Sequence, residues 1–160
     1  MVKYIIGIIS AAAFFVVGLM GLVAAEFWYF ENQLNVSPLT GVRQDTWLQD
    51  FSDNAFYHLL TALIFTLIWH TAGFFYFRIN VWTKAGGRLV WAGLFVVMLV
   101  TVAVISWQST DATQDAGKLL AVMAYLLNAA FVYYGSSLLA SPTTVKYVPP
   151  GAVQLGRVWS

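Results

Sequence analysis

Four long apolar stretches dominate this chain of 160 residues and limit its fold more than any other feature. They cover residues 4–30, 55–77, 89–107 and 119–140. A helix needs about 20 consecutive apolar residues to cross the hydrocarbon core of a bilayer. Only 9% of the residues are charged, whereas a soluble domain carries about 25%. We therefore predict an all-α membrane protein of four transmembrane helices, arranged as two helical hairpins.

The connections leave little chain for a separate soluble domain. An outer loop over residues 31–54, two short connections and a tail over 141–160 accompany the spans. We therefore expect a single four-helix transmembrane domain over residues 1–160. The sequence contains no cysteine, which excludes disulfides and cysteine-ligated metal or iron–sulfur sites. It also contains no Ser/His/Asp, HExxH or glycine-rich phosphate motif, so we do not expect an enzyme.

Basic residues predict the orientation of the chain. Lys and Arg are retained preferentially in short loops on the cytoplasmic side of a membrane. The side of the N-terminus, the middle turn and the tail carries Lys3, Arg78, Lys84, Arg88, Lys146 and Arg157, and only Arg43 and Lys118 lie on the other. We therefore expect an integral protein of a bacterial cytoplasmic (inner) membrane, with both termini in the cytoplasm.

Small residues indicate which spans pack closely. Helices associate in lipid through close contacts of small side chains and through polar groups that meet each other. The first and fourth spans carry such residues at favourable spacing, so we expect these two to pack tightly, against each other or against a partner. The residues are Gly7, Ala11, Gly18, Gly21 and Ala25 in the first span and Ala129, Gly135 and Ser136 in the fourth.

Polar residues inside the spans are the candidates for a functional site, because such residues are costly in a bilayer. At ~1.5 Å per residue, His70 lies ~12 Å from the inner end of its span. Ser10 and Asn128 lie at ~10 and ~18 Å on their own spans, and Thr66 is one turn from His70. We expect these four residues to form a buried polar cluster. The same counting places His58 and Glu26 at the outer interface.

The two histidines leave a cofactor as an alternative. A pair twelve residues apart on one membrane helix, His58 and His70, resembles the helices of b-type cytochromes. The resemblance implies haem b, or a quinone, bound at His70. Bis-histidine ligation needs a second imidazole from a facing helix, so here the second ligand would be Met98, Met123 or a histidine of another subunit.

The outer loop and the tail carry two further predictions. In the segment "DTWLQDF", Asp45 is a candidate N-cap of a short interfacial helix, with Ser52 or Asp53 capping the second span. The spacing of the acidic residues matches no EF-hand pattern. The apolar tail is expected to bind a neighbouring subunit through Tyr147, Pro149, Pro150 and Trp159.

These features favour a non-catalytic subunit that packs against other integral membrane subunits and organises a larger complex. A secretion or conjugation machine, or a respiratory or photosynthetic complex, fits this description. The alternatives are the haem- or quinone-binding electron-transfer anchor and a membrane-embedded immunity protein against a pore-forming toxin. We expect the lipid bilayer and bound lipid as further partners, and the net charge of +1 gives no support for a nucleic-acid partner.

Overall fold

The computed structural model describes residues 2–79 and 84–140, and all regular secondary structure in these ranges is helical. Its elements are α1 (Val2–Val16), the π-helical segment η1 (Val17–Leu22), α2 (Val23–Gln33), α3 (Ser37–Thr40), α4 (Gln44–Ile79), α5 (Lys84–Ser109) and α6 (Asp115–Ala140). Four helical stretches are long and apolar enough to cross a membrane: Tyr4–Gln33, Gln44–Gly73, Gly86–Ser109 and Asp115–Leu139. The predicted all-α architecture with four such helices is confirmed.

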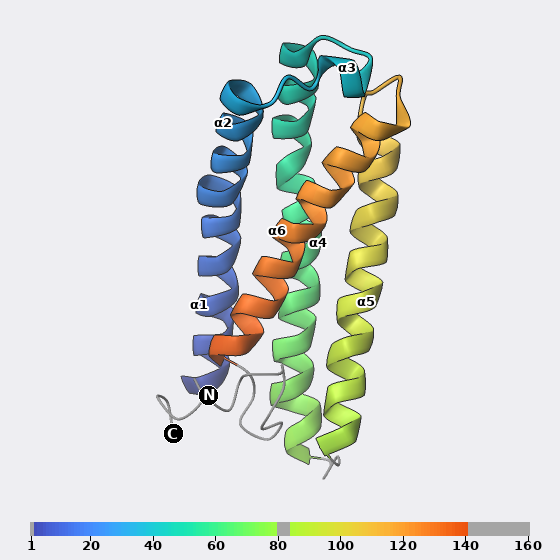
Figure 1. The fold of residues 1–160 in the computed structure, drawn as a ribbon. Coiled ribbons are helices and arrows are strands. Elements are labelled where there is room, and N and C mark those ends of the chain that lie inside the picture. The colour runs from blue at the N-terminus through green and yellow to red at the C-terminus, as the bar shows by residue number, and fades with distance from the viewer. Residues whose placement is uncertain (1, 80–83, 141–160) are drawn as a thin grey trace.

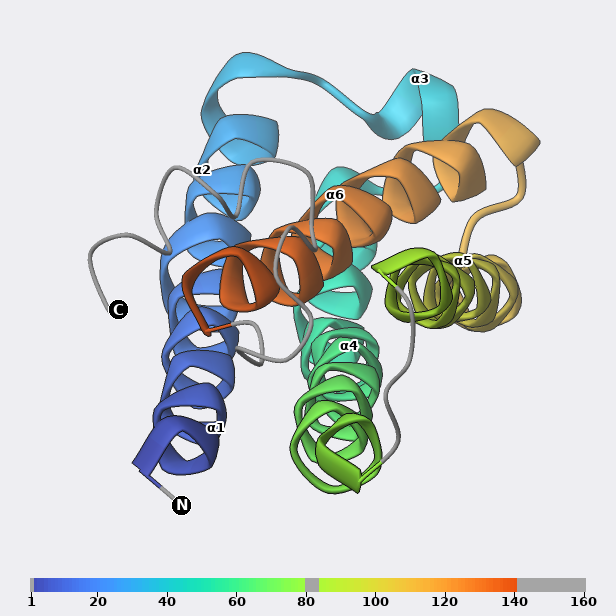
Figure 2. The same ribbon diagram turned by 90° about the horizontal axis from the view of Figure 1, so that it is seen from below.

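Helix α6 holds the bundle together by packing on each of the other long helices (Figure 1). It runs obliquely, from the end of α5 that carries Ser109 to the beginning of α1. Seen from below, α1 and α5 lie on opposite sides, with α4 between them and α6 crossing one face of this row (Figure 2). The tilt of α6 therefore decides which residues of the other helices it meets.

The first span contains a π-helical segment that changes which face points into the bundle. The buried residues of the first span follow a helical spacing through Gly7 and Ala11 of α1 to Gly18, the second residue of η1. The next buried residue is Val23, five positions later, and Val23 N–H donates to Gly18 O, as π-helical hydrogen bonding requires. From there the inward face continues through Glu26, Phe27 and Phe30.

Helix α4 begins at Gln44, so the predicted boundary between a short interfacial helix and the second span is wrong. Ser52 and Asp53 lie inside one continuous helix and cap nothing. No glycine or proline interrupts the chain between Gln44 and Gly73, and the buried residues Trp47, Leu48, Phe51, Ala55, Leu59 and Ala62 keep one helical stripe across the expected boundary. Asp45 instead pairs with Arg43 on the surface.

The two outer connections pack on each other and fix that end of the bundle. The amides of Thr113 and Gln114 both donate to Thr40 O, at 2.9 and 3.2 Å. Gly117, in the first turn of α6, lies so close to Thr40 that an added Cβ would come within 2.6 Å of the Thr40 Cα. Gly41 follows with a φ of 70°, a conformation that glycine adopts without strain.

Candidate functional site

The interior polar groups of the bundle gather along α6. Four of its side chains form hydrogen bonds to three different helices. Tyr125 donates to Phe51 O of α4, Asn128 Nδ2 to Glu26 Oε2 of α2 at 2.6 Å, Tyr133 to Trp91 O of α5 at 3.0 Å, and Ser136 Oγ bonds His70 Nε2 of α4 at 3.0 Å. Each bond joins α6 to a different depth of the bundle, and together they define its register.

His70 is buried, with 2% of its surface exposed, and Ser136 is its polar partner. Gly7 of α1 packs on the other side of the ring, since a Cβ at Gly7 would lie 2.9 Å from His70 Nδ1. The imidazole is therefore enclosed by three helices: its own α4, α6 and α1.

The predicted cluster of Ser10, Thr66, His70 and Asn128 is not formed. Thr66 donates to Ala62 O of its own helix at 2.7 Å. The hydroxyl of Ser10 has no hydrogen-bond partner among the described residues, and Asn128 bonds Glu26 instead. The depth estimates assumed that all helix ends lie at one level, but α6 ends well short of the inner end of α4 (Figure 1). Ser136, nearer to the end of α6 than Asn128, is therefore the residue that reaches His70.

The surroundings of His70 do not fit a haem as they are packed. Its Nε2 is engaged by Ser136, and Gly7 covers the Nδ1 side. A porphyrin would have to separate α1 and α6 from the ring. Of the two candidate methionine ligands, Met98 is fully buried in the core, whereas Met123 is 50% exposed on the outer face of α6.

Glu26 and Asn128 form a polar pair that the sequence analysis did not foresee. Glu26 was expected at the outer interface, yet its partner lies in the middle of α6, ~18–20 Å from either end of that helix. Asn128 is 1% exposed, and its Nδ2 also donates to Ala124 O at 3.1 Å. The Oδ1 of Asn128 is buried and has no donor among the described residues. The half-buried carboxylate of Glu26 thus reaches the bundle interior from the first span.

His58 of α4 lies beside Ser109 at the end of α5, and it faces into the bundle. Its ring centroid is 4.0 Å from that of Tyr125, and its Nε2 is 3.3 Å from Ser109 Oγ. Only 1% of the residue is exposed. A sequence signal for this burial existed, because His58 directly precedes Leu59 in the buried stripe of α4.

Close packing of α1 against α6 uses most of the predicted small residues. Gly18 approaches Val132, and Gly135 approaches Phe14. Ala11, Ala129 and Ser136 are fully buried. Gly21 and Ala25 are exposed, because the π-helical segment η1 turns the following residues by about one position, so for these two residues only packing against a partner stays a prediction.

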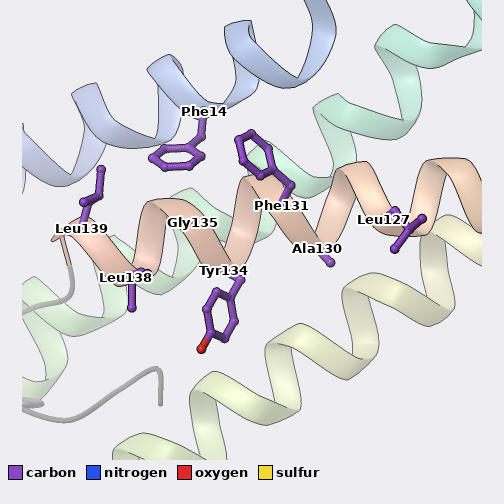
Figure 3. A pocket seen from close by; sticks show the side chains of 8 residues that line it. All are labelled: Phe14, Leu127, Ala130, Phe131, Tyr134, Gly135, Leu138 and Leu139. Carbon is purple, nitrogen blue, oxygen red and sulfur yellow. The ribbon is translucent and has the colours of Figure 1, made fainter. Parts of the chain in front are cut away.

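An open apolar groove of about 500 Å³ lies where α1 meets the outer face of α6 (Figure 3). The ring centroids of Phe14 and Phe131 lie 5.1 Å apart at its upper wall. The Phe14 ring packs directly on Gly135, where an added Cβ would lie 2.2 Å from Phe14 Cε1. The lining residues are Phe14, Leu127, Ala130, Phe131, Tyr134, Gly135, Leu138 and Leu139. Such a surface suits acyl chains.

Comparison with protein-family models, with curated proteins and with solved structures found no match. The predicted tail contacts, Tyr147, Pro149, Pro150 and Trp159, lie outside the described residues.

Proposed function

We propose that this protein is a small, non-catalytic integral-membrane subunit that packs against partner helices and organises a larger membrane complex. For the larger complex, we propose a secretion or conjugation machine, or a respiratory or photosynthetic complex. The site of action is a bacterial cytoplasmic membrane, with both termini in the cytoplasm.

The proposal rests mainly on the hydrogen bonds that interior polar side chains form between helices. Tyr125, Asn128, Tyr133 and Ser136 of α6 bond the other three spans. These groups serve to hold helices in register, which is the common use of polar side chains in membrane bundles. This arrangement supports a role as a scaffold, because the bonds between helices leave these polar groups with little capacity to bind a substrate.

The helices differ in the share of their residues that is buried within the chain, and this difference supports the proposal. In the most apolar window of each helix, half of the residues of α6 are buried within the chain, but only 17% of those of the first span. The third span, with 22% of its window buried, is nearly as uncovered, so the bundle presents two largely uncovered helices to its surroundings. The bound lipid that we propose has a suitable place in the groove beside Phe14.

Purification from native membranes under mild conditions tests the proposal. We expect stoichiometric partner subunits to remain attached through a size-exclusion step. A monodisperse, stable protein without partners would refute it. An absorption spectrum of the same preparation tests the electron-transfer alternative, which requires a Soret band or extractable quinone.

A further inference from the structure

We propose that the uncovered face of the first span, around Glu26, is the docking surface for a partner transmembrane helix that carries a lysine or an arginine. This inference rests on the proposed function and names the chemistry of the partner. It follows from the hydrogen-bond balance at Glu26 and from the position of this residue on the bundle.

The Glu26–Asn128 pair has more acceptors than donors. An ionised carboxylate only accepts hydrogen bonds, and an amide supplies two N–H groups. Both N–H groups of Asn128 are used, one by Glu26 Oε2 and the other by Ala124 O. The Oδ1 of Asn128 is buried without a donor among the described residues. The Oδ1 of Asn128 is enclosed by this chain, but the half-buried carboxylate of Glu26 receives only the one donor from Asn128. A cation is a group that can both donate to this carboxylate and neutralise its charge.

The described part of the chain does not supply this cation. Its one ion pair between side chains joins Arg43 to Asp45 on the outer surface. Both histidines are engaged elsewhere, His58 with Ser109 and His70 with Ser136. Since intramembrane carboxylates are nearly always paired, a cationic partner from outside the described residues is expected, and we place it on a partner helix.

The surface beside Glu26 is open to such a helix. Glu26 itself is half-buried. The neighbouring side chains on the same helix that point away from the bundle are large and exposed: Val17 51%, Met20 70%, Leu22 36%, Trp28 58% and Tyr29 52%. Between them, Gly21 and Ala25 are exposed small residues, which allow another backbone to approach closely. An apolar helix with one cation at the level of Glu26 complements this surface in shape and charge.

Site-specific cross-linking in native membranes tests the surface. A photoreactive phenylalanine analogue is placed at Leu22 and at Tyr29, and at Val100 of α5 as a control, because Val100 is equally apolar and 57% exposed. We expect cross-links from positions 22 and 29 to one membrane subunit, within a span that contains a Lys or Arg. Cross-links from Val100 alone, to a second copy of this chain, or to lipid alone would overturn the inference.

Charge variants test the pairing. Glu26→Gln keeps the size of the side chain and removes its charge, and Glu31→Gln is the matched control because Glu31 is exposed on the same helix. We expect Glu26→Gln to reduce recovery of the partner by about tenfold or more, the change that 1.4 kcal/mol produces, while Glu31→Gln leaves it unchanged. Glu26→Lys combined with Glu in place of the partner's cation should restore it.

The outcomes separate this inference from the proposed function. Full recovery of partners by the Glu26→Gln protein would overturn the docking surface and leave the scaffold role intact. Absence of any stoichiometric partner of the wild-type protein would overturn both. Thermal unfolding of each variant in detergent shows whether a lost partner reflects lost folding, and in that case the wild-type cross-links decide.

Discussion

Gly117 shows how a single residue fixes the outer end of the bundle. A Cβ at this position would meet the backbone of Thr40 at 2.6 Å, whereas a Cβ at Gly93 of α5 would meet nothing within 4 Å. We expect Gly117→Ala to destabilise the protein by about 1–3 kcal/mol through overpacking. Gly93→Ala should stabilise it by up to about 1 kcal/mol, because alanine is the better helix former.

Thermal or denaturant unfolding in the same detergent measures both glycine variants. We expect the two variants to change the free energy of unfolding in opposite directions. If Gly117→Ala were as stable as the wild type, the packing of α3 on the start of α6 would not hold.

The His70–Ser136 bond is the second test at the residue scale. Ser136→Ala would leave Nε2 of His70 buried without its partner, which costs about 1–3 kcal/mol. Ser106→Ala is the matched control, since Ser106 is also fully buried but donates within its own helix, to Ala103 O. We expect its effect to be below about 1 kcal/mol. Equal losses in the two variants would assign no special role to the contact with His70.

Sequence reasoning identified His70 as an interior residue but not its partner. The residue types predicted that the imidazole would find a hydroxyl or an amide on a neighbouring span. The choice between Ser10, Asn128 and Ser136 depends on the tilt of α6, which periodicity does not encode. The partner of Glu26 was missed for the same reason, because a depth counted along one helix says nothing of the residue that faces it.

The π-helical segment η1 gives the first span its particular shape. One additional residue in the turn lets Gly18 and Val23 lie on the same face. Deletion of Met20, which is 70% exposed, should convert this turn into regular α-helix and keep both flanking faces inward. We expect a change in the free energy of unfolding within about 1 kcal/mol.

Deletion of Ile9, which is 61% exposed in α1, is the control for the Met20 deletion. It rotates the preceding residues by about 100° around the helix and removes Gly7 from His70. We expect a loss of about 3 kcal/mol or more, or no folded protein. A Met20 deletion that is as harmful as the Ile9 deletion would contradict the role given to η1.

The helices differ in how accurately the sequence predicted their ends. Helices α5 and α6 extend the predicted spans by only a few residues, because the polar segment between them and the basic turn before α5 mark their ends in the sequence. Helix α4 is longer than its apolar run, since Trp47, Leu48 and Phe51 find a core beyond the hydrophobic stretch. The composition of the segment η1 gives no sign of a π-helical turn. The turn allows Val23 and Phe30 to be buried on the face that holds Gly18.

At the scale of the whole molecule, the orientation in the membrane is open to a direct test, because the native chain has no cysteine. Single cysteines at the exposed positions Glu31 and Asp115 should react with a membrane-impermeant maleimide in intact cells. A cysteine at Arg88, exposed near the opposite end, should react only after permeabilisation. The reverse labelling pattern would invert the proposed topology.

The central position of α6 also has a consequence for biosynthesis. This helix leaves the ribosome after the other three spans, yet it supplies the partners of Glu26, His70 and two backbone carbonyls of α4 and α5. Until α6 is inserted, the other three spans lack these hydrogen-bond partners. We therefore expect these four spans to reach their packed arrangement only after the fourth enters the membrane, and chains that stop before Asp115 to be degraded faster than the full chain.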